Sequence, residues 1–234
     1  MIGPPTDAAV PDHAGVAPQA VLLDMDGTLV DSEALWGRAE REVVSGLGGV
    51  WTDEDHRRNV GAASVPVTRY IIELTGTDVP PAAVAAELRA AFSRQLAGGV
   101  ELRPGAKELV AAVARSDVPM ALVTSTERSV VDAAIGGIGA GSFDVTVAGD
   151  EVEQNKPAPD PYLRAARLLG ADPARCVAVE DSPVGIASAV AAGCVTVAVP
   201  SMVALEEADG LTVLDSLVGV DLRWMGALVR EQRG

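Results

Sequence analysis

The stretch Val21-Leu22-Leu23-Asp24-Met25-Asp26-Gly27-Thr28 decides the fold of this chain, because it joins a short apolar run directly to polar residues. Three consecutive aliphatic residues followed by aspartates are typical of a buried parallel strand, which carries polar side chains at its carboxyl end. Gly27 would allow a tight turn directly after the strand. We therefore predict that a parallel sheet begins here and that its first strand delivers reactive groups to one edge.

Further apolar runs alternate with helical patterns along the rest of the chain. The apolar runs are 119–123, 145–148, 176–179 and 195–199, and the amphipathic helical patterns are 126–135, 160–169 and 183–192. This alternation predicts βαβ units, and hence an α/β fold with a doubly wound parallel sheet. Residues 211–214 fit a final edge strand, and residues 216–230 fit a closing helix.

The segment from residue 32 to about residue 99 breaks this alternation. It contains no strand-like run, and helical patterns occupy 33–47, 65–75 and 81–97. We therefore predict an all-helical cap domain over 32–99, inserted into an α/β core of residues 20–31 and 100–234, with two linkers that make it a candidate lid. Residues 1–19 carry four prolines without periodicity, which predicts a disordered tail.

The overall charge limits the partners that the chain can have. There are 18 Lys and Arg residues against 33 Asp and Glu residues, which gives a formal charge of −15. Such a chain is a poor match for nucleic acid, whose phosphates need clustered cations. We find neither a signal-peptide pattern nor an apolar stretch long enough to span a membrane, so we expect a cytoplasmic protein. Cys176 and Cys194 lie in apolar runs and are expected to be buried thiols.

Polar residues follow several of the predicted strands, at the edge where α/β sheets place their reactive sites. Four carboxylates brought together there would repel one another and raise each other's pKa unless a cation neutralised them. Because the ligand atoms would all be oxygen, we predict bound Mg²⁺. The candidate residues are Asp24 and Asp26 after the first strand, Thr124 and Ser125 after the second, Lys156 after the third, and Glu180 and Asp181 after the fourth.

These residue types suit phosphoryl transfer. Asp24 could attack phosphorus and form an aspartyl-phosphate. Asp26 could protonate the leaving oxygen and later activate water. Thr124 and Lys156 could bind the phosphoryl oxygens, and Ser125 could contact the phosphate through its backbone. The metal and Lys156 would then supply the local positive charge that the chain as a whole lacks.

Four motifs in this order resemble the haloacid dehalogenase superfamily, specifically its phosphatase and β-phosphoglucomutase-like branch with a small helical cap. The motifs are DMDGTLVDS at 24–32, VTS at 123–125, KP at 156–157 and EDS at 180–182, and the resemblance covers nearly everything from Val21 onward. It implies that Asp24, the backbone carbonyl of Asp26 and Asp181 hold the metal, with Glu180 in or beside its shell. It further implies that the chain removes phosphate from a small phosphorylated metabolite, such as a sugar phosphate.

In the resembling family, cap residues that face the core select the substrate, and cap closure excludes water. In this chain the candidates are Arg57 and Gly61, at the two ends of the segment 57–61. An arginine could bind a second anionic or hydroxyl group of the substrate. The alternative is that Arg57 is an ordinary solvated charge of a helix.

Other functions fit the sequence less well. A sugar phosphomutase would carry identical motifs, but we identify no residues specific to it, and hydrolysis is the preferred interpretation. A signalling receiver domain, which also accepts phosphate on an aspartate, needs neither the helical insert nor the acid at Asp26, and a dehalogenase needs no Mg²⁺. His13 and His56 are the two histidines of the chain, so a Ser-His-Asp hydrolase would lack a base. We expect a monomer or weak homodimer.

One glycine-rich run also has two interpretations. The run GGIGAG at 136–141 could suggest a nucleotide-binding loop, but it follows a predicted helix and precedes a predicted strand, which is the reverse of the required order. We therefore expect these glycines to end a helix.

Overall fold

The computed structural model describes residues 17–60, 62, 64–96, 101–201 and 211–232. Within these ranges, six parallel strands form one sheet in the order β3-β2-β1-β4-β5-β6. They are β1 (Ala20–Leu23), β2 (Met120–Val123), β3 (Val145–Val147), β4 (Cys176–Glu180), β5 (Val195–Ala198) and β6 (Leu211–Val213). The chain moves from β1 to one side of the sheet and then crosses to the other side at β4. The predicted doubly wound α/β fold is confirmed.

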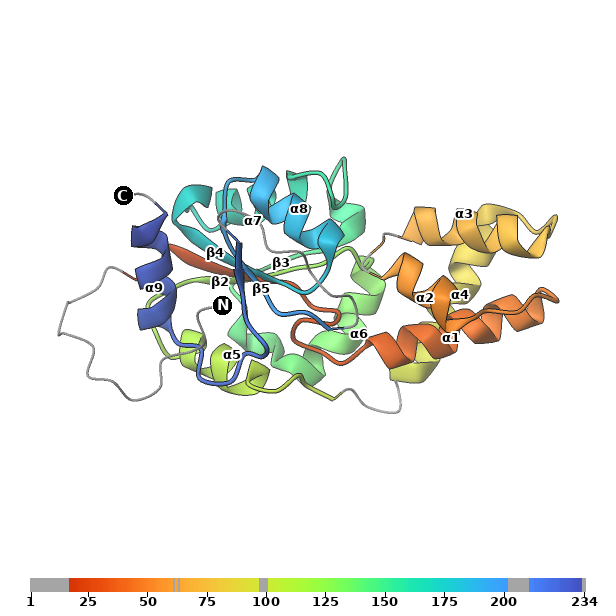
Figure 1. Cartoon of the computed structure of the whole chain (residues 1–234), viewed down its shortest axis with the longest axis horizontal. Coiled ribbons are helices and arrows are strands. Elements are labelled where there is room, and N and C mark those ends of the chain that lie inside the picture. Colours follow the sequence, from red (N-terminus) through yellow and green to blue (C-terminus); the bar gives the residue numbers. More distant parts are fainter. Residues whose placement is uncertain (1–16, 61, 63, 97–100, 202–210, 233–234) are drawn as a thin grey trace.

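Helices cover both faces of the sheet (Figure 1). One face carries α5 (Ala106–Ala114), α6 (Arg128–Ile138) and α9 (Leu222–Glu231), and the other carries α7 (Asp160–Leu168) and α8 (Pro183–Ala191). Val21 and Leu23 of β1 join the apolar cluster on the first face, whereas Ala20 and Leu22 join the cluster on the second. Because the sheet is buried on both sides, its strands read as continuous apolar runs.

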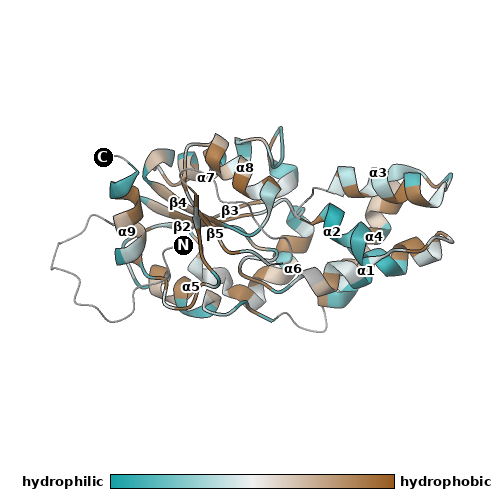
Figure 2. Cartoon of the chain, viewed as in Figure 1, coloured by the Kyte–Doolittle hydropathy of each residue, from teal (hydrophilic) through white to brown (hydrophobic). Residues whose placement is uncertain are grey.

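The face under α7 and α8 is built mainly from small side chains. Of the 13 buried residues described in its apolar cluster, seven are alanine and two are cysteine. Small side chains allow the helices to approach the sheet closely. The strands between the two helical layers are strongly hydrophobic (Figure 2). Cys176 and Cys194 are buried and free, as expected, and burial raises the pKa of each thiol to about 12.

Between β1 and α5 the chain forms a group of helices that extends away from the sheet (Figure 1). Its members are α1 (Glu33–Gly46), α2 (Asp53–Asn59), α3 (Ser64–Thr75) and α4 (Pro81–Leu96). Helix α1 packs along α4, where the rings of Trp36 and Phe92 stack with their centroids 3.6 Å apart. The chain enters this group of helices after Asp31 and returns to the core near Glu101. These two connections lie side by side, and the Asp31 amide donates to the Glu101 carbonyl at 2.8 Å. The helical content matches the predicted insert.

Two helices were missed by the sequence patterns. Helix α2 has the sequence DEDHRRN, in which His56 is the buried residue, so it shows no apolar periodicity. Its start is instead marked by a capping box, in which Asp55 N donates to the Thr52 hydroxyl and Thr52 N donates to the Asp55 carboxylate. Helix α5 is amphipathic but short, and it directly follows the second connection.

The ends of several elements also differ from the predicted bounds. Helix α6 extends to Ile138, and Gly139 follows it with φ of +116°. This confirms that the glycine-rich run ends a helix. The closing helix begins at Leu222 because Asp221 caps it by accepting from Trp224 N. Residues 1–16 of the predicted tail lie outside the described residues, and no helix in the described ranges is long and apolar enough to cross a membrane.

The small-residue face gives a test of packing. Ala178 of β4 is fully buried against α7 and α8, so Ala178→Leu should overpack this face and lower the unfolding free energy by about 1–3 kcal/mol. Urea unfolding followed by circular dichroism measures the change. Ala83→Leu, at an exposed position of α4, is the matched control and should change the unfolding free energy by less than about 0.5 kcal/mol. Equal midpoints for the two variants would contradict the close packing.

Candidate active site

The carboxyl ends of β1, β2 and β4 meet at one edge of the sheet. Asp24 directly follows β1, Thr124 follows β2, and Glu180 ends β4. Strand β1 pairs with both β2 and β4, and Asp24 N donates to the Val179 carbonyl at 3.0 Å. Asp24 therefore lies at the switch point of the sheet, which is where α/β proteins bind ligands.

Lys156 is a buried cation at this edge. Its Nζ donates to Asp24 Oδ1 at 2.7 Å, to Glu180 Oε1 at 2.6 Å and to the Val123 carbonyl oxygen at 2.9 Å. Burial alone would lower the pKa of Lys156, but the carboxylates of Asp24 and Glu180 outweigh it and raise this pKa above its ordinary value. The ammonium group therefore stays charged and compensates two buried carboxylates.

Tyr162 of α7 completes this group and was missed by the sequence analysis. Its hydroxyl donates to Glu180 Oε1 at 2.6 Å, and its ring centroid lies 5.2 Å from Lys156 Nζ. Burial and the neighbouring Glu180 carboxylate raise the pKa of the Tyr162 hydroxyl, so it remains a proton donor. The available signal was a tyrosine on an otherwise apolar helix face, because a buried hydroxyl requires a partner.

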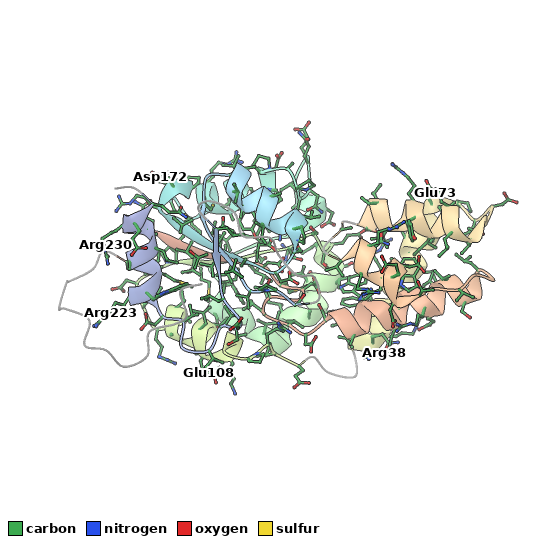
Figure 3. All side chains as sticks on the ribbon, viewed as in Figure 1. Arg38, Glu73, Glu108, Asp172, Arg223 and Arg230 are labelled. Carbon is green, nitrogen blue, oxygen red and sulfur yellow. The ribbon has the colours of Figure 1, made fainter. Side chains whose placement is uncertain are left out.

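Three carboxylates lie close enough together to hold a metal ion. One oxygen each from Asp24, Glu180 and Asp181 lies within 4.8 Å of the others. These side chains are buried, whereas charged residues such as Glu73 and Arg230 are exposed and point outward in Figure 3. This burial matters because charges interact more strongly in a low-dielectric interior than in water.

The negative charge of Asp24, Glu180 and Asp181 favours binding of a divalent cation. Burial raises the pKa of Asp24 well above its ordinary value, Glu180 and Asp181 raise it further, and Lys156 opposes them. Asp24 Oδ2 is buried and has no hydrogen-bond partner among the described residues. A hard cation would satisfy this oxygen and reduce the repulsion, so the residues fit Mg²⁺.

Two glycines make room for these carboxylates. Gly27 has φ of +80°, and a Cβ atom there would lie 2.0 Å from Asp181 Oδ2. A Cβ atom on Gly185, in the first turn of α8, would lie 2.0 Å from Glu180 Oε2. Any larger residue would displace a carboxylate of the group, and the tight turn predicted at Gly27 is confirmed.

Asp26 is held separately, by four neutral donors. Its Oδ1 accepts from Ser32 Oγ at 2.6 Å and from Trp36 Nε1 at 3.3 Å. Its Oδ2 accepts from Thr126 Oγ1 at 2.8 Å and from Thr124 Oγ1 at 3.3 Å. The donors therefore come from both the insert and the core, and Trp36 and Thr126 were not identified from the sequence. The metal contact expected through the Asp26 backbone carbonyl stays a prediction.

Ser125 has an unexpected feature. Its hydroxyl is buried without a hydrogen-bond partner among the described residues, while its carbonyl accepts from Asn155 Nδ2 at 3.1 Å. A buried hydroxyl is costly unless a ligand or water satisfies it. The side chain of Ser125 is therefore available for a phosphoryl oxygen, where the sequence analysis expected a backbone contact.

A cavity extends from these residues into the helical insert. Arg89 of α4 lines it and pairs with Glu127 at 2.9 Å. Arg57 does not line it, because Arg57 faces a separate groove and pairs with Glu54 at 2.9 Å. Gly61, the other candidate of the insert, lies outside the described residues. The lining includes Asp24, Asp26, Thr124, Ser125, Thr126, Lys156 and Asp181 from the core, and Trp36, Glu40, His56, Asn59 and Arg89 from the insert.

Known proteins are similar to this chain in sequence and architecture. The family model for haloacid dehalogenase-like hydrolases matches residues 18–193. Protein CbbY of Rhodobacter capsulatus is 39% identical over 196 residues, covering 78% of this chain and 86% of that protein. Fructose-1-phosphate phosphatase YqaB of Escherichia coli is 34% identical over 174 residues, covering 74% and 92%. CbbY from Rhodobacter sphaeroides in complex with xylulose-(1,5)bisphosphate gives a TM-score of 0.78 at 32% identity, covering 88% of this chain and 100% of that one.

The cluster of Asp24, Glu180 and Asp181 predicts that Mg²⁺ stabilises the folded protein. Saturating Mg²⁺ near neutral pH should raise Tm by at least about 3 °C, because binding to the folded state alone adds to stability. The raised pKa of Asp24 makes protons compete with the metal at higher pH than at an ordinary aspartate, so the rise should shrink as pH is lowered. Thermal-shift measurements test this.

A matched pair of variants locates the effect. Asp181→Asn should lose most of the Mg²⁺-dependent rise in Tm, whereas Glu73→Gln, at an exposed position of α3, should keep it. Equal Mg²⁺ responses of the two variants would show that the cation binds elsewhere.

Proposed function

The chain belongs to the haloacid dehalogenase-like hydrolase family, in its phosphatase branch, and we propose that it is a magnesium-dependent phosphohydrolase of small phosphorylated sugars. The observation that carries this proposal is the position of Asp24, at the switch point of the sheet with Oδ1 on Lys156 and Oδ2 without a partner among the described residues. YqaB is named for a sugar monophosphate and a CbbY structure holds a sugar bisphosphate, which supports the substrate class.

Asp24 is the proposed nucleophile. One of its carboxylate oxygens forms a bond to phosphorus while the bond from phosphorus to the sugar oxygen breaks. The products of this step are an aspartyl-phosphate and a sugar alkoxide that needs a proton. As Asp24 becomes an acyl phosphate, its carboxylate loses its negative charge and the departing sugar oxygen carries that charge away. The Lys156 hydrogen now bonded to Oδ1 can then be donated to a phosphoryl oxygen.

Asp26 is the proposed general acid and base. It lines the same cavity as Asp24, and its four donors fix the orientation of its carboxyl group. Asp26 gives a proton to the departing sugar oxygen, and then takes one from a water molecule whose oxygen attacks the phosphorus of the aspartyl-phosphate. This second step releases inorganic phosphate and restores Asp24.

Mg²⁺, when bound, would neutralise charge on the phosphoryl group during transfer. Asp24, Asp181 and Glu180, with the Asp26 carbonyl, are the groups proposed to hold it. Thr124 and Ser125 are proposed to complete the phosphate site.

Residues 32–99 are proposed to act as a cap over this site. The cavity has walls from both the insert and the core, and the two connections between them are joined through backbone hydrogen bonds. Asp26 receives donors from Ser32 and Trp36, so the position of the insert affects the general acid. Closure would exclude water that competes with the reaction.

The setting of the enzyme is also a proposal. Two free buried cysteines are consistent with a cytoplasmic location. The formal charge of −15 argues against nucleic acid as a partner. A monomer or weak homodimer is the proposed state.

A screen of phosphorylated metabolites tests the function. With Mg²⁺, free phosphate should be released from at least one sugar phosphate, and EDTA should abolish the release. Asp24→Asn should lower kcat by at least about 10³-fold, because an amide is a poor nucleophile. Detecting isomerised sugar phosphates in the same assay distinguishes a mutase. Activity that survives in Asp24→Asn would show that another group is the nucleophile.

Asp26→Asn separates the two steps of the reaction. Without its proton transfer, turnover should fall by about 10²–10⁴-fold. Hydrolysis of the aspartyl-phosphate should slow as well, so rapid acid quenching followed by intact-protein mass spectrometry should detect a phosphorylated chain when a substrate with a good leaving group is used. Unchanged steady-state rates would remove Asp26 from acid–base catalysis.

A further inference from the structure

We propose that Glu40, which lines the cavity on the side of the insert, selects the substrate. The part of the substrate next to Glu40 would carry hydroxyl groups and no second phosphate. This inference rests on the proposed function. The substrate would then be the monophosphate of a polyol or sugar. The observation behind this is a buried carboxylate in the wall of the same cavity that contains Asp24 and Lys156.

Glu40 is held firmly within the insert. Its Oε2 accepts from Trp51 Nε1 at 2.9 Å and lies 2.5 Å from His56 Nδ1. The three residues are 4%, 5% and 6% exposed in the order Glu40, Trp51 and His56, so these contacts form away from bulk water. Two partners on one carboxylate oxygen fix the side chain in the cavity wall, which favours recognition of a defined ligand group.

His56 lies opposite Gly37 of α1. A Cβ atom on Gly37 would lie 3.6 Å from His56 Nε2, an ordinary contact distance, so the imidazole lies next to α1 at this position. Helices α1 and α2 are therefore joined around the Glu40–His56 contact. Glu40 is placed by tertiary contacts within the insert, to Trp51 and His56.

The charges at this end of the cavity oppose a second phosphate. Glu40, Arg89 and Glu127 line it, together with His56. Arg89 already pairs with Glu127 at 2.9 Å, His56 lies 2.5 Å from Glu40, and Lys156 contacts Asp24 and Glu180. Each of these basic side chains of the described lining therefore already has a carboxylate partner, and none is left for a second phosphate. A phosphate carries about 1.5–2 negative charges near neutral pH and would meet the Glu40 carboxylate. A sugar hydroxyl would instead donate a charge-assisted hydrogen bond to Glu40.

Matched pairs of sugar phosphates test this selection. The proposed pairs are fructose 1-phosphate with fructose 1,6-bisphosphate, and ribulose 5-phosphate with ribulose 1,5-bisphosphate, since each pair exchanges one hydroxyl for phosphate. In at least one pair the wild-type kcat/KM should favour the monophosphate by about tenfold or more. Preference for the bisphosphate in both pairs, or no discrimination in either, would overturn the inference.

Glu40→Gln keeps the shape of the side chain and an oxygen for Trp51, but removes the charge. It should lower the monophosphate-to-bisphosphate ratio of kcat/KM by about tenfold. Glu42→Gln is the matched control on the same helix, because the Glu42 side chain is 45% exposed and pairs with Arg94 at 2.6 Å. It should leave the ratio unchanged. An equal ratio for Glu40→Gln and wild type would overturn the inference.

Two further measurements keep the outcome decisive. If Glu40→Gln lowers Tm by more than about 10 °C, Trp51→Phe replaces it. This variant should reduce the ratio by about threefold, because Glu40 loses one of the two contacts that fix its carboxylate in the cavity wall. An unchanged ratio would overturn the inference. Calorimetric titration of Asp24→Asn with both ligands of each pair measures the preference without turnover. Absence of wild-type turnover, including that of p-nitrophenyl phosphate, would contradict the proposed function, whereas absence of a binding preference for the monophosphate would contradict the selection by Glu40.

Discussion

The ammonium group of Lys156 lies between the carboxylates of Asp24 and Glu180, and the arrangement of the reactive edge depends on this buried contact. Two carboxylates side by side in a nonpolar interior would repel each other or take up protons. Lys156 offsets this, and Tyr162 supplies a further donor to Glu180. The carboxyl ends of β1 and β4 can therefore carry buried acidic side chains beside a cation, where a polar substrate can be positioned by rigid strands.

The two aspartates of the first motif have the same chemistry and different surroundings. Asp24 is surrounded by charges, with Lys156 on one oxygen and two acids nearby. Asp26 is surrounded by neutral hydroxyl and indole donors. Different environments allow identical side chains to take different roles, as a nucleophile and as a proton carrier. Part of the environment of Asp26 belongs to the helical insert, which links the position of the insert to the chemistry.

Close backbone approach is the second constraint on this edge. Gly27 and Gly185 leave room for Asp181 and Glu180, where a Cβ atom would lie 2.0 Å from each carboxylate. The alanine-rich face under α7 also allows close approach, because it brings Tyr162 near enough to donate to Glu180. The charged group and the tight packing thus depend on each other, and both require small residues beside large polar ones.

Local sequence patterns are enough to predict the parallel sheet, the helical insert between β1 and α5, and the polar residues at the strand ends. These follow from local order along the chain, since an apolar run that ends in aspartate places that aspartate at the sheet edge in any parallel fold. Tertiary packing brings Tyr162, Trp36 and Thr126 into the site. It also places Arg89, and not Arg57, in the lining of the cavity. Such choices depend on which face of a helix is turned toward a distant segment, and that orientation is set by long-range packing.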